Sequence, residues 1–202
     1  MKKQITLSLI LALSWATIGV AQDQAEVFCF FSPNGGCERV IVDAIDHAES
    51  EVLIAAYSFS SKPIAHSLFR ASRRGVPVYV LLDKSQPTAH YSMVDDLAAG
   101  GLSVAIDRRE QIMHMKTIII DRKMILTGSY NFTASAESRN AEILLLIKGE
   151  GTAQKAVANW ETHFNHSQPV LQFAKRRCKN GYCPMVPTEP PSPTKFRRHR
   201  KW

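Results

Sequence analysis

Beyond its first twenty residues, the sequence lacks any apolar run long enough to cross a bilayer, so we predict no membrane span there. It also lacks clustered carboxylates, and no set of histidines and cysteines has metal-ligand spacing near its densest group of reactive residues. A site built on a bound metal is therefore not indicated, and we predict no cofactor. Acidic residues are scarce at the C-terminal end, where Glu189 is the single acidic residue among the last 35 positions. That imbalance indicates a basic segment suited to an anionic partner.

The most informative stretch of the sequence follows the spacing H-x-K-x4-D-x6-G-S-x-N. Its six defining residues are His114, Lys116, Asp121, Gly128, Ser129 and Asn131. An imidazole is partly unprotonated at neutral pH and can act as a nucleophile, while a lysine ammonium can hold a phosphate oxygen. Ser129 and Asn131 add a hydroxyl and an amide, and Gly128 allows close approach of the backbone. Together these groups predict a metal-free cradle for a phosphate.

His114 and Lys116 are two residues apart, and on a strand such residues leave the same face. Ile118 and Ile120 continue that face inward, as expected for a strand buried on both sides. The reactive groups then sit at the open end of the strand. Asp121 has the opposite parity to His114, so we expect it to pair with a cation or to shape the turn after the strand.

This spacing resembles the HKD signature of the phospholipase D superfamily, a group of phosphodiesterases that includes lipases, endonucleases and cardiolipin hydrolases. The residues that the resemblance implies are catalytic His114, Lys116 and Asp121 and substrate-binding Lys116, Ser129 and Asn131. Glu142, eleven residues after Asn131, resembles the downstream acidic position of the family and joins the catalytic set. Its carboxylate is expected to accept the other ring N–H of His114, which fixes the tautomer and raises the nucleophilicity.

Only one H-x-K occurs in the chain, and this count changes the expected mechanism. Cleavage through a covalent intermediate needs a nucleophile and a separate acid for the leaving oxygen. In a two-fold homodimer the same patch meets itself, so two copies of His114 can face one phosphate. The resemblance to single-motif family members implies the same arrangement. One copy would form a phosphohistidine and the other would donate the proton, which predicts a bell-shaped dependence of activity on pH.

The first residues have the pattern of a secretory signal peptide, which we predict over residues 1–21. Lys2 and Lys3 precede a mainly apolar run from Ile5 to Val20, which ends in a small-x-small site at Gly19-Val20-Ala21. The alternative is an uncleaved membrane anchor, but hydroxyl residues interrupt a run already short for a span. We therefore expect a periplasmic or secreted protein.

The four cysteines agree with an oxidising compartment. Each of two pairs brackets turn residues that can bring the sulfurs together, so we predict the local disulfides Cys29–Cys37 and Cys178–Cys183. A shared zinc site and cross-pairing between the two ends of the chain are the alternatives.

Alternating strand and helix patterns from Glu26 to about Ser167 predict one α/β domain. The clearest elements are strands at 27–31, 52–57, 78–82, 124–127 and 143–147 and helices near 37–48, 63–75, 91–99 and 153–164. They imply a phospholipase D-like, mixed and largely parallel sheet with helices on both faces. We place that catalytic domain at residues 22–167 and expect Val157 and Trp160 to point inward from its last helix.

Residues 168–202 are predicted to be a basic, Pro-rich and disordered tail. They hold nine Lys or Arg against one acid, a net charge of +8, whereas residues 22–167 carry −3. Such a tail is expected to contact nucleic acid, an anionic membrane surface or an acidic partner by salt-sensitive attraction. Phe196 and Trp202 are available for stacking or interfacial insertion. The alternative is a solvated end without a partner.

The motif recognises a phosphate but not the groups attached to it, so three functions stay open. The first is a non-specific endonuclease that hydrolyses DNA, or RNA. Size, leader and segments such as Tyr57-Ser-Phe-Ser-Ser-Lys-Pro-Ile-Ala resemble the short, secreted, single-motif endonucleases of the superfamily. The second is a lipid phosphodiesterase, for which the sequence shows no clear apolar surface. The third is a phosphate-binding module without catalysis. We expect the other histidines to be surface or packing residues: His47, His66, His90, His163, His166 and His199.

Overall fold

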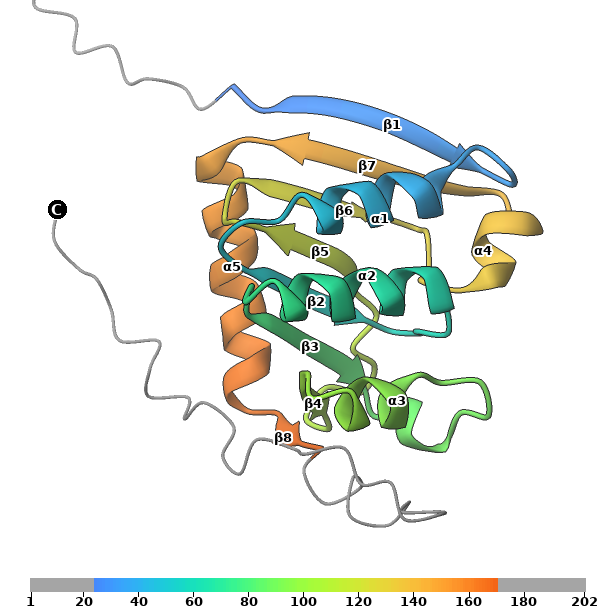
Figure 1. The fold of residues 1–202 in the computed structure, drawn as a ribbon, viewed down its shortest axis with the longest axis vertical. Helices are drawn as coiled ribbons and strands as arrows, with labels where there is room; N and C mark the ends of the chain where they lie inside the picture. The colour runs from blue at the N-terminus through green and yellow to red at the C-terminus, as the bar shows by residue number, and fades with distance from the viewer. Residues whose placement is uncertain (1–23, 171–202) are drawn as a thin grey trace, which may run out of the picture.

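One mixed sheet of eight strands organises residues 24–170, the part of the chain that this computed structural model describes. The strand order is β1-β7-β6-β5-β2-β3-β4-β8 (Figure 1). The strands are β1 (Glu26–Ser32), β2 (Val52–Ala56), β3 (Val78–Asp83), β4 (Ser103–Asp107), β5 (Lys116–Ile120), β6 (Met124–Gly128), β7 (Glu142–Lys148) and β8 (Gln168–Pro169). The helices are α1 (Cys37–Asp46), α2 (Lys62–Arg73), α3 (Val94–Ala99), α4 (Ala134–Ser138) and α5 (Glu150–Asn165), with a 3₁₀ turn at Gln86–Thr88.

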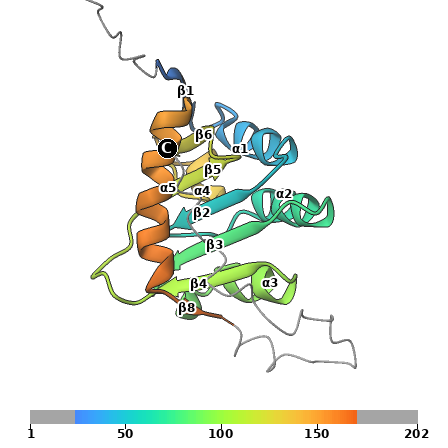
Figure 2. The same ribbon diagram turned by 90° about the vertical axis from the view of Figure 1, so that its left-hand side faces the viewer.

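Helices cover both faces of the sheet, as the alternating pattern predicts. α1, α2 and α3 lie on one face, and α5 crosses the other (Figure 2). The larger hydrophobic core includes residues of α1–α3, and the smaller one includes residues of α5. Val157 and Trp160 point inward from α5, as expected, and the Trp160 indole N–H donates to Ile54 O at 2.8 Å. This hydrogen bond lets a large aromatic ring be buried without leaving its polar atom unpaired.

The sheet is mixed, as predicted, but the expectation that it is largely parallel is wrong for its strand pairs. β2–β3 and β3–β4 are parallel, whereas the other five neighbouring pairs of the described sheet are antiparallel. A parallel pair needs a long crossover, which the segments containing α2 and α3 supply. β5 and β6 are instead joined by three residues, 121–123, and so short a connection permits only an antiparallel hairpin.

Most predicted elements are confirmed to within a few residues. The helix expected from Tyr91 begins at Val94, and the sequence pattern does not indicate β4, α4 or β8. β8 pairs with β4 and Val170 is buried, so the folded domain continues three residues past the predicted boundary at 167. The predicted leader, most of the basic tail, Cys178 and Cys183 lie outside the described residues. Within residues 24–170, no helix is both long and apolar enough to span a membrane.

Cys29 and Cys37 do not form the predicted disulfide, because both are free. Cys37 begins α1 and is buried in the larger core, whereas Cys29 is exposed on β1. Phe30, the neighbour of Cys29, packs against that same core. Because successive side chains of a strand point to opposite faces, Cys29 points away from α1. The turn between the cysteines reverses the chain, but strand parity keeps the two sulfurs apart.

One edge of the sheet collects the strand ends that carry the motif. Ala56 ends β2 and lies opposite Lys116, the first residue of β5. Gly128 ends β6 and lies opposite Leu144, near the start of β7. β3 and β4 run parallel to β2, so they end at the same edge. We call this the motif edge; it comprises the C-terminal ends of β2, β3, β4 and β6 and the N-terminal ends of β5 and β7.

Candidate active site

His114 and Lys116 lie together at the motif edge. Lys116 begins β5, and His114 lies just before the strand rather than within it as predicted. Lys116 Nζ is 3.0 Å from His114 Nε2 and also donates to His114 O at 3.0 Å. Ile118 and Ile120 continue the Lys116 face into the larger core, as expected. His114 is exposed, whereas Lys116 is only 7% exposed. The imidazole can therefore contact a substrate directly, and the buried ammonium lies behind it, in contact with Nε2.

Tyr57 belongs to this site, although the motif does not include it. It follows β2, and its backbone N–H donates to Met115 O at 2.8 Å. The Tyr57 ring centroid lies 4.6 Å from that of His114 and 5.0 Å from Lys116 Nζ. An aromatic face attracts an ammonium at this distance and packs against the imidazole. Tyr57 therefore positions both residues. Its signals in the sequence are its place at the end of a predicted strand and the segment it begins, which resembles the single-motif endonucleases.

The ammonium of Lys116 is incompletely compensated by the protein. Burial lowers its pKa below the ordinary lysine value, and the nearby Glu142 carboxylate acts in the opposite direction. A lowered pKa means that folding disfavours the charged form of the side chain. An anion bound at the motif edge would supply the missing negative charge, so this residue is complementary to a phosphate oxygen.

Gly128 brings β6 close to β7, as the sequence predicts. Its φ is 145°, and a Cβ at this position would lie 2.2 Å from Ile143 O. Ser129 follows at the motif edge, where its Oγ accepts from Ile143 N–H at 3.1 Å and donates to Glu142 Oε2 at 2.5 Å. The hydroxyl is thus held in one orientation by groups from β7.

Glu142 does not make the expected hydrogen bond to His114. Within residues 24–170 its carboxylate accepts from Asn140 Nδ2 at 3.1 Å and from the Ser129 hydroxyl. The Ser129 hydroxyl reaches the Glu142 carboxylate because Ser129 directly follows β6, which is the neighbour of β7. His114 precedes β5, which is one strand further from β7. The structure therefore places Glu142 as a counter-charge for Lys116 and a partner of Ser129.

Asn131 carries an unpaired polar atom near the motif edge. Its Oδ1 is buried and has no hydrogen-bond partner within the described part of the chain. The next residue is fixed, because Phe132 O accepts from the backbone N–H groups of Ser60 and Ser61 at 2.9 Å. A buried polar atom without a partner destabilises a protein by about 1–3 kcal/mol. A phosphodiester carries acceptor oxygens only, so the amide Nδ2 and not this oxygen would bind it, and the substrate-binding role of Asn131 stays a prediction.

Asp121 lies at the opposite end of β5 from His114, so the structure does not bring it to the site. It occupies the β5–β6 turn with a φ of 53°. Its carboxylate accepts from the backbone N–H groups of Glu49, Ser50 and Glu51 at 2.7–3.2 Å and from the Ser50 hydroxyl at 2.8 Å. Of the two roles that strand parity allowed, the structure favours shaping the turn, and the catalytic role implied by the resemblance is corrected.

We expect Asp121→Asn to lower the free energy of unfolding by about 1–2 kcal/mol while leaving activity per folded molecule unchanged. Burial raises the pKa of Asp121, but hydrogen bonds from the 49–51 loop outweigh it, and the pKa is lowered overall. Its stabilisation is therefore present above the unfolded pKa of about 3.9 and is lost as pH falls through the folded value. Urea unfolding from pH 7 to pH 3 should show a shallower acid dependence in the variant. Asp43→Asn, at an exposed position on α1, is the control, and equal acid dependence in all three proteins would contradict this role.

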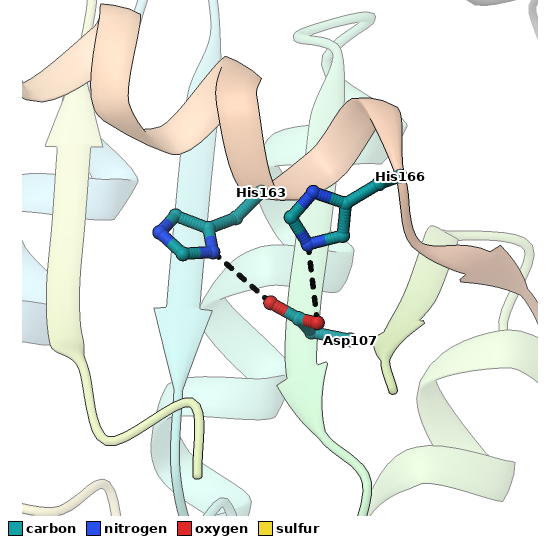
Figure 3. A group of neighbouring side chains, drawn as sticks. All are labelled: Asp107, His163 and His166. Carbon is teal, nitrogen blue, oxygen red and sulfur yellow. Dashed lines mark hydrogen bonds and ion pairs between the residues drawn. The ribbon is translucent and has the colours of Figure 1, made fainter. Parts of the chain in front are cut away.

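Two histidines that we expected to be surface or packing residues instead share a buried acid. His163 Nδ1 is 3.1 Å from Asp107 Oδ2, and His166 Nε2 is 3.2 Å from Asp107 Oδ1 (Figure 3). Asp107 ends β4, while His163 lies in the last turn of α5 and His166 caps that helix. The spacing of three residues at the end of the helix predicted over 153–164 is the signal in the sequence, but His166 lies just beyond that range and the spacing does not reveal the carboxylate. The cluster is distinct from His114, since β2 and β3 separate β4 from β5.

The described domain is similar to known proteins over most of its length. Residues 41–167 match the family described as cardiolipin synthase, PLD-like domain. A phospholipase D from Rickettsia felis is 39% identical over 137 residues, which cover 68% of each chain. A mitochondrial cardiolipin hydrolase from Xenopus laevis is 32% identical over 108 residues, or 54% of this chain and 51% of that one. Among solved structures, the phospholipase D family member Nuc from Salmonella typhimurium is 30% identical with a TM-score of 0.69, covering 72% of this chain and 98% of Nuc.

These matches agree with the geometry of the motif edge. The domain that matches contains the complete H-x-K-x4-D-x6-G-S-x-N spacing, and the fold brings His114 and Lys116 into contact. An exposed imidazole above a buried ammonium is chemically suited to attack on a phosphodiester. This chain belongs to the phospholipase D superfamily and is a phosphodiesterase.

Proposed function

We propose that this phosphodiesterase is a metal-independent endonuclease that hydrolyses DNA at a site completed by a second copy of the chain. His114 attacks phosphorus, so that a P–N bond forms and the P–O bond to the leaving group breaks. The partner subunit's His114 gives its proton to the leaving oxygen. Water then attacks the phosphorus of the phosphohistidine and gives a proton to the partner subunit's His114, and the P–N bond breaks. Lys116 stabilises the negative charge on the non-bridging oxygens in both steps.

The observation that carries the choice of nucleic acid is a row of exposed cations on loops of the motif edge. Lys84 follows β3, and Arg108 and Arg109 follow β4. None of the three forms an ion pair within residues 24–170, and Lys84 Nζ donates to the backbone oxygen of Glu110 at 3.0 Å. A polyanion lying across these loops can reach His114. Contacts of this kind with phosphates are independent of base sequence, which supports a non-specific nuclease.

A phospholipase D-type lipid phosphodiesterase is the second candidate, and two exposed apolar side chains favour it. Tyr91 is 80% exposed, and Ile112, two residues before His114, is 56% exposed. Both belong to loops that follow strands ending at the motif edge, where they can contact a lipid surface. The names of the relatives from Rickettsia felis and Xenopus laevis support the same substrate class. The other large exposed apolar side chains of the described residues, Val27, Phe28 and Phe31, lie on β1, three strand spacings from β5. Tyr91 and Ile112 alone supply less apolar surface than acyl chains require, so we rank this function second.

The test is a paired assay in excess EDTA with the chain from Gln22 onward, the predicted mature protein. One arm contains supercoiled plasmid, and the other contains vesicles of cardiolipin and phosphatidylglycerol. We expect nicked and linear plasmid and intact lipid. Lipid hydrolysis with intact plasmid would make the second candidate the function. Strict dependence on added Mg²⁺ or Ca²⁺ would reject the phosphohistidine mechanism.

The exposed cations can be tested with a triple variant, Lys84→Gln, Arg108→Gln and Arg109→Gln. For the triple variant, the slope of log DNA affinity against log salt concentration should be shallower by up to about 2.7, because each phosphate contact contributes about 0.9 to its magnitude. Hydrolysis of bis(p-nitrophenyl) phosphate, which is too small to reach the loops, should be unchanged. The matched control is Lys123→Gln with Lys155→Gln, at exposed positions away from the motif edge. An unchanged salt slope in the triple variant would remove the support for nucleic acid.

A further inference from the structure

We propose that Asp107, His163 and His166 form a binding site for a divalent metal ion of the zinc class, with Glu110 as a fourth ligand. The site lies at the motif edge beneath the C-terminal end of α5 (Figure 3). It does not include the His114–Lys116 pair, and the proposal is independent of the substrate of the enzyme.

The three side chains present the ligand types that zinc prefers, imidazole nitrogen and carboxylate oxygen. His163 and His166 both direct a ring nitrogen at the Asp107 carboxylate (Figure 3). One ligand atom from each residue lies within 4.8 Å of the others. In a tetrahedral site with bonds of about 2.1 Å, ligand atoms are about 3.4 Å apart. Side-chain adjustments of about an ångström therefore bring this cluster to the required size.

The carboxylate at the centre of the cluster is held in place by the protein. Asp107 is fully buried and accepts from the backbone N–H groups of Arg109 at 3.0 Å and Glu110 at 3.4 Å. Bonds of this kind fix the orientation of a metal ligand and raise the affinity of its site. The two imidazoles are partly exposed, so an ion can reach the carboxylate from the solvent side.

Glu110 supplies a fourth ligand. Its Oε1 is 4.0 Å from His163 Nδ1, and its side chain is 42% exposed, so it is free to turn onto a bound ion. Four protein ligands would fill the tetrahedral coordination of zinc, which is the arrangement of structural sites rather than catalytic ones. We therefore assign the site a structural role.

A metal at this position would join three segments that meet at the motif edge. It would link the end of β4 to the end of α5 and fix the start of the 108–115 loop, which leads to His114. The loop is already held near its other end, where Met113 N–H donates to Asp83 at 2.8 Å. β4 and β5 are three strand spacings apart, about 14 Å, so the ion would not touch a phosphate at His114. We expect bound metal to raise thermal stability while hydrolysis still proceeds in EDTA.

Metal binding by the untagged protein tests the proposal. After removal of metals by chelation and dialysis, Zn²⁺ is titrated in competition with a chromophoric chelator, and Co²⁺ is titrated by its visible absorption. The decisive variant is His166→Gln, because glutamine keeps a hydrogen-bond donor for Asp107 but is not a zinc ligand. The matched control is His90→Ala, at an exposed histidine that contacts the Tyr91 ring edge-to-face outside the cluster.

We expect wild type and His90→Ala to bind one more Zn²⁺ per chain than His166→Gln does, and to show a tetrahedral Co²⁺ spectrum. In the variant the affinity should fall by at least about 100-fold, and Zn²⁺ should no longer raise the midpoint of thermal unfolding. Equal stoichiometry and affinity in wild type and His166→Gln would overturn the proposal and leave a carboxylate hydrogen-bonded by two histidines. If metal-free His166→Gln does not fold, His163→Gln provides the same comparison.

Discussion

Replacing His114 with alanine is expected to reduce phosphodiester hydrolysis by at least about 10⁴-fold, because it removes the group that bonds to phosphorus. The fold should survive, since His114 is exposed and its contacts are the Lys116 interactions and the ring contact with Tyr57. The free energy of unfolding should change by less than about 1 kcal/mol. Initial rates on bis(p-nitrophenyl) phosphate measure the effect without the contribution of the loops that bind a longer substrate.

The matched control for this variant is His47→Ala. His47 is an exposed histidine that caps α1, where its Nδ1 lies 2.7 Å from Asp43 O. We expect full activity in this control. Rapid quenching of wild type with a labelled substrate should trap a phosphohistidine, and peptide mapping should place it on His114. A rate in His114→Ala within tenfold of wild type would exclude this residue as the nucleophile.

Mixed dimers distinguish the two histidine roles that one motif per chain requires. A heterodimer of wild type and His114→Ala, isolated with two different affinity tags, contains a nucleophile or an acid but not both. It should be inactive, so activity in a random mixture should follow the square of the wild-type fraction. A linear dependence would mean that each chain is complete by itself and that the acid lies elsewhere in the same subunit.

The local geometry of the motif could be predicted because β5 is buried on both faces. Ile118 and Ile120 belong to the larger core and Ile119 to the smaller one, so the register of the strand is determined by its apolar residues. Lys116 shares the parity of Ile118, which predicts that its side chain leaves the same face of the strand. Asp121 follows Ile120 and has the opposite parity to His114, which allows it to shape the turn after the strand. The close approach of β6 to β7 at Gly128 is predicted separately, from the missing side chain of glycine.

Contacts between distant segments could not be predicted in this way, because spacing along the chain does not determine strand order. Tyr57 reaches His114 because β2 pairs with β5, and Glu142 meets Ser129 because β6 pairs with β7. The expectation of a largely parallel sheet follows from alternating strands and helices. The pairing of β1 with β7 instead joins segments more than a hundred residues apart. His163 contacts a carboxylate 56 residues earlier in the chain for the same reason.

Replacing Lys116 with methionine is expected to lower kcat by about 10²–10³-fold without a comparable loss of stability. Methionine is unbranched and one atom shorter than lysine, so it keeps most of the packing of the side chain but loses the charge that holds a phosphate oxygen. Burial of the ammonium destabilises the folded protein, as its lowered pKa indicates, whereas its hydrogen bond to His114 O stabilises by about 1 kcal/mol. We therefore expect the variant to unfold at the same or a higher urea concentration at neutral pH.

The pH dependence of stability separates this explanation from a simple loss of packing. Because the folded pKa of Lys116 lies below its unfolded value of about 10.4, the penalty for burying the charge is fully present below the folded pKa. The penalty decreases as pH rises from the folded pKa towards the unfolded value, because the folded protein then holds a neutral amine while the unfolded chain still binds the proton. Wild type should therefore gain stability relative to Lys116→Met between pH 7 and pH 10. Lys123→Met, at an exposed residue in the β5–β6 turn, should match wild type in both rate and pH dependence. A constant stability difference would contradict the burial penalty, and a rate within tenfold of wild type would show that another cation holds the phosphate.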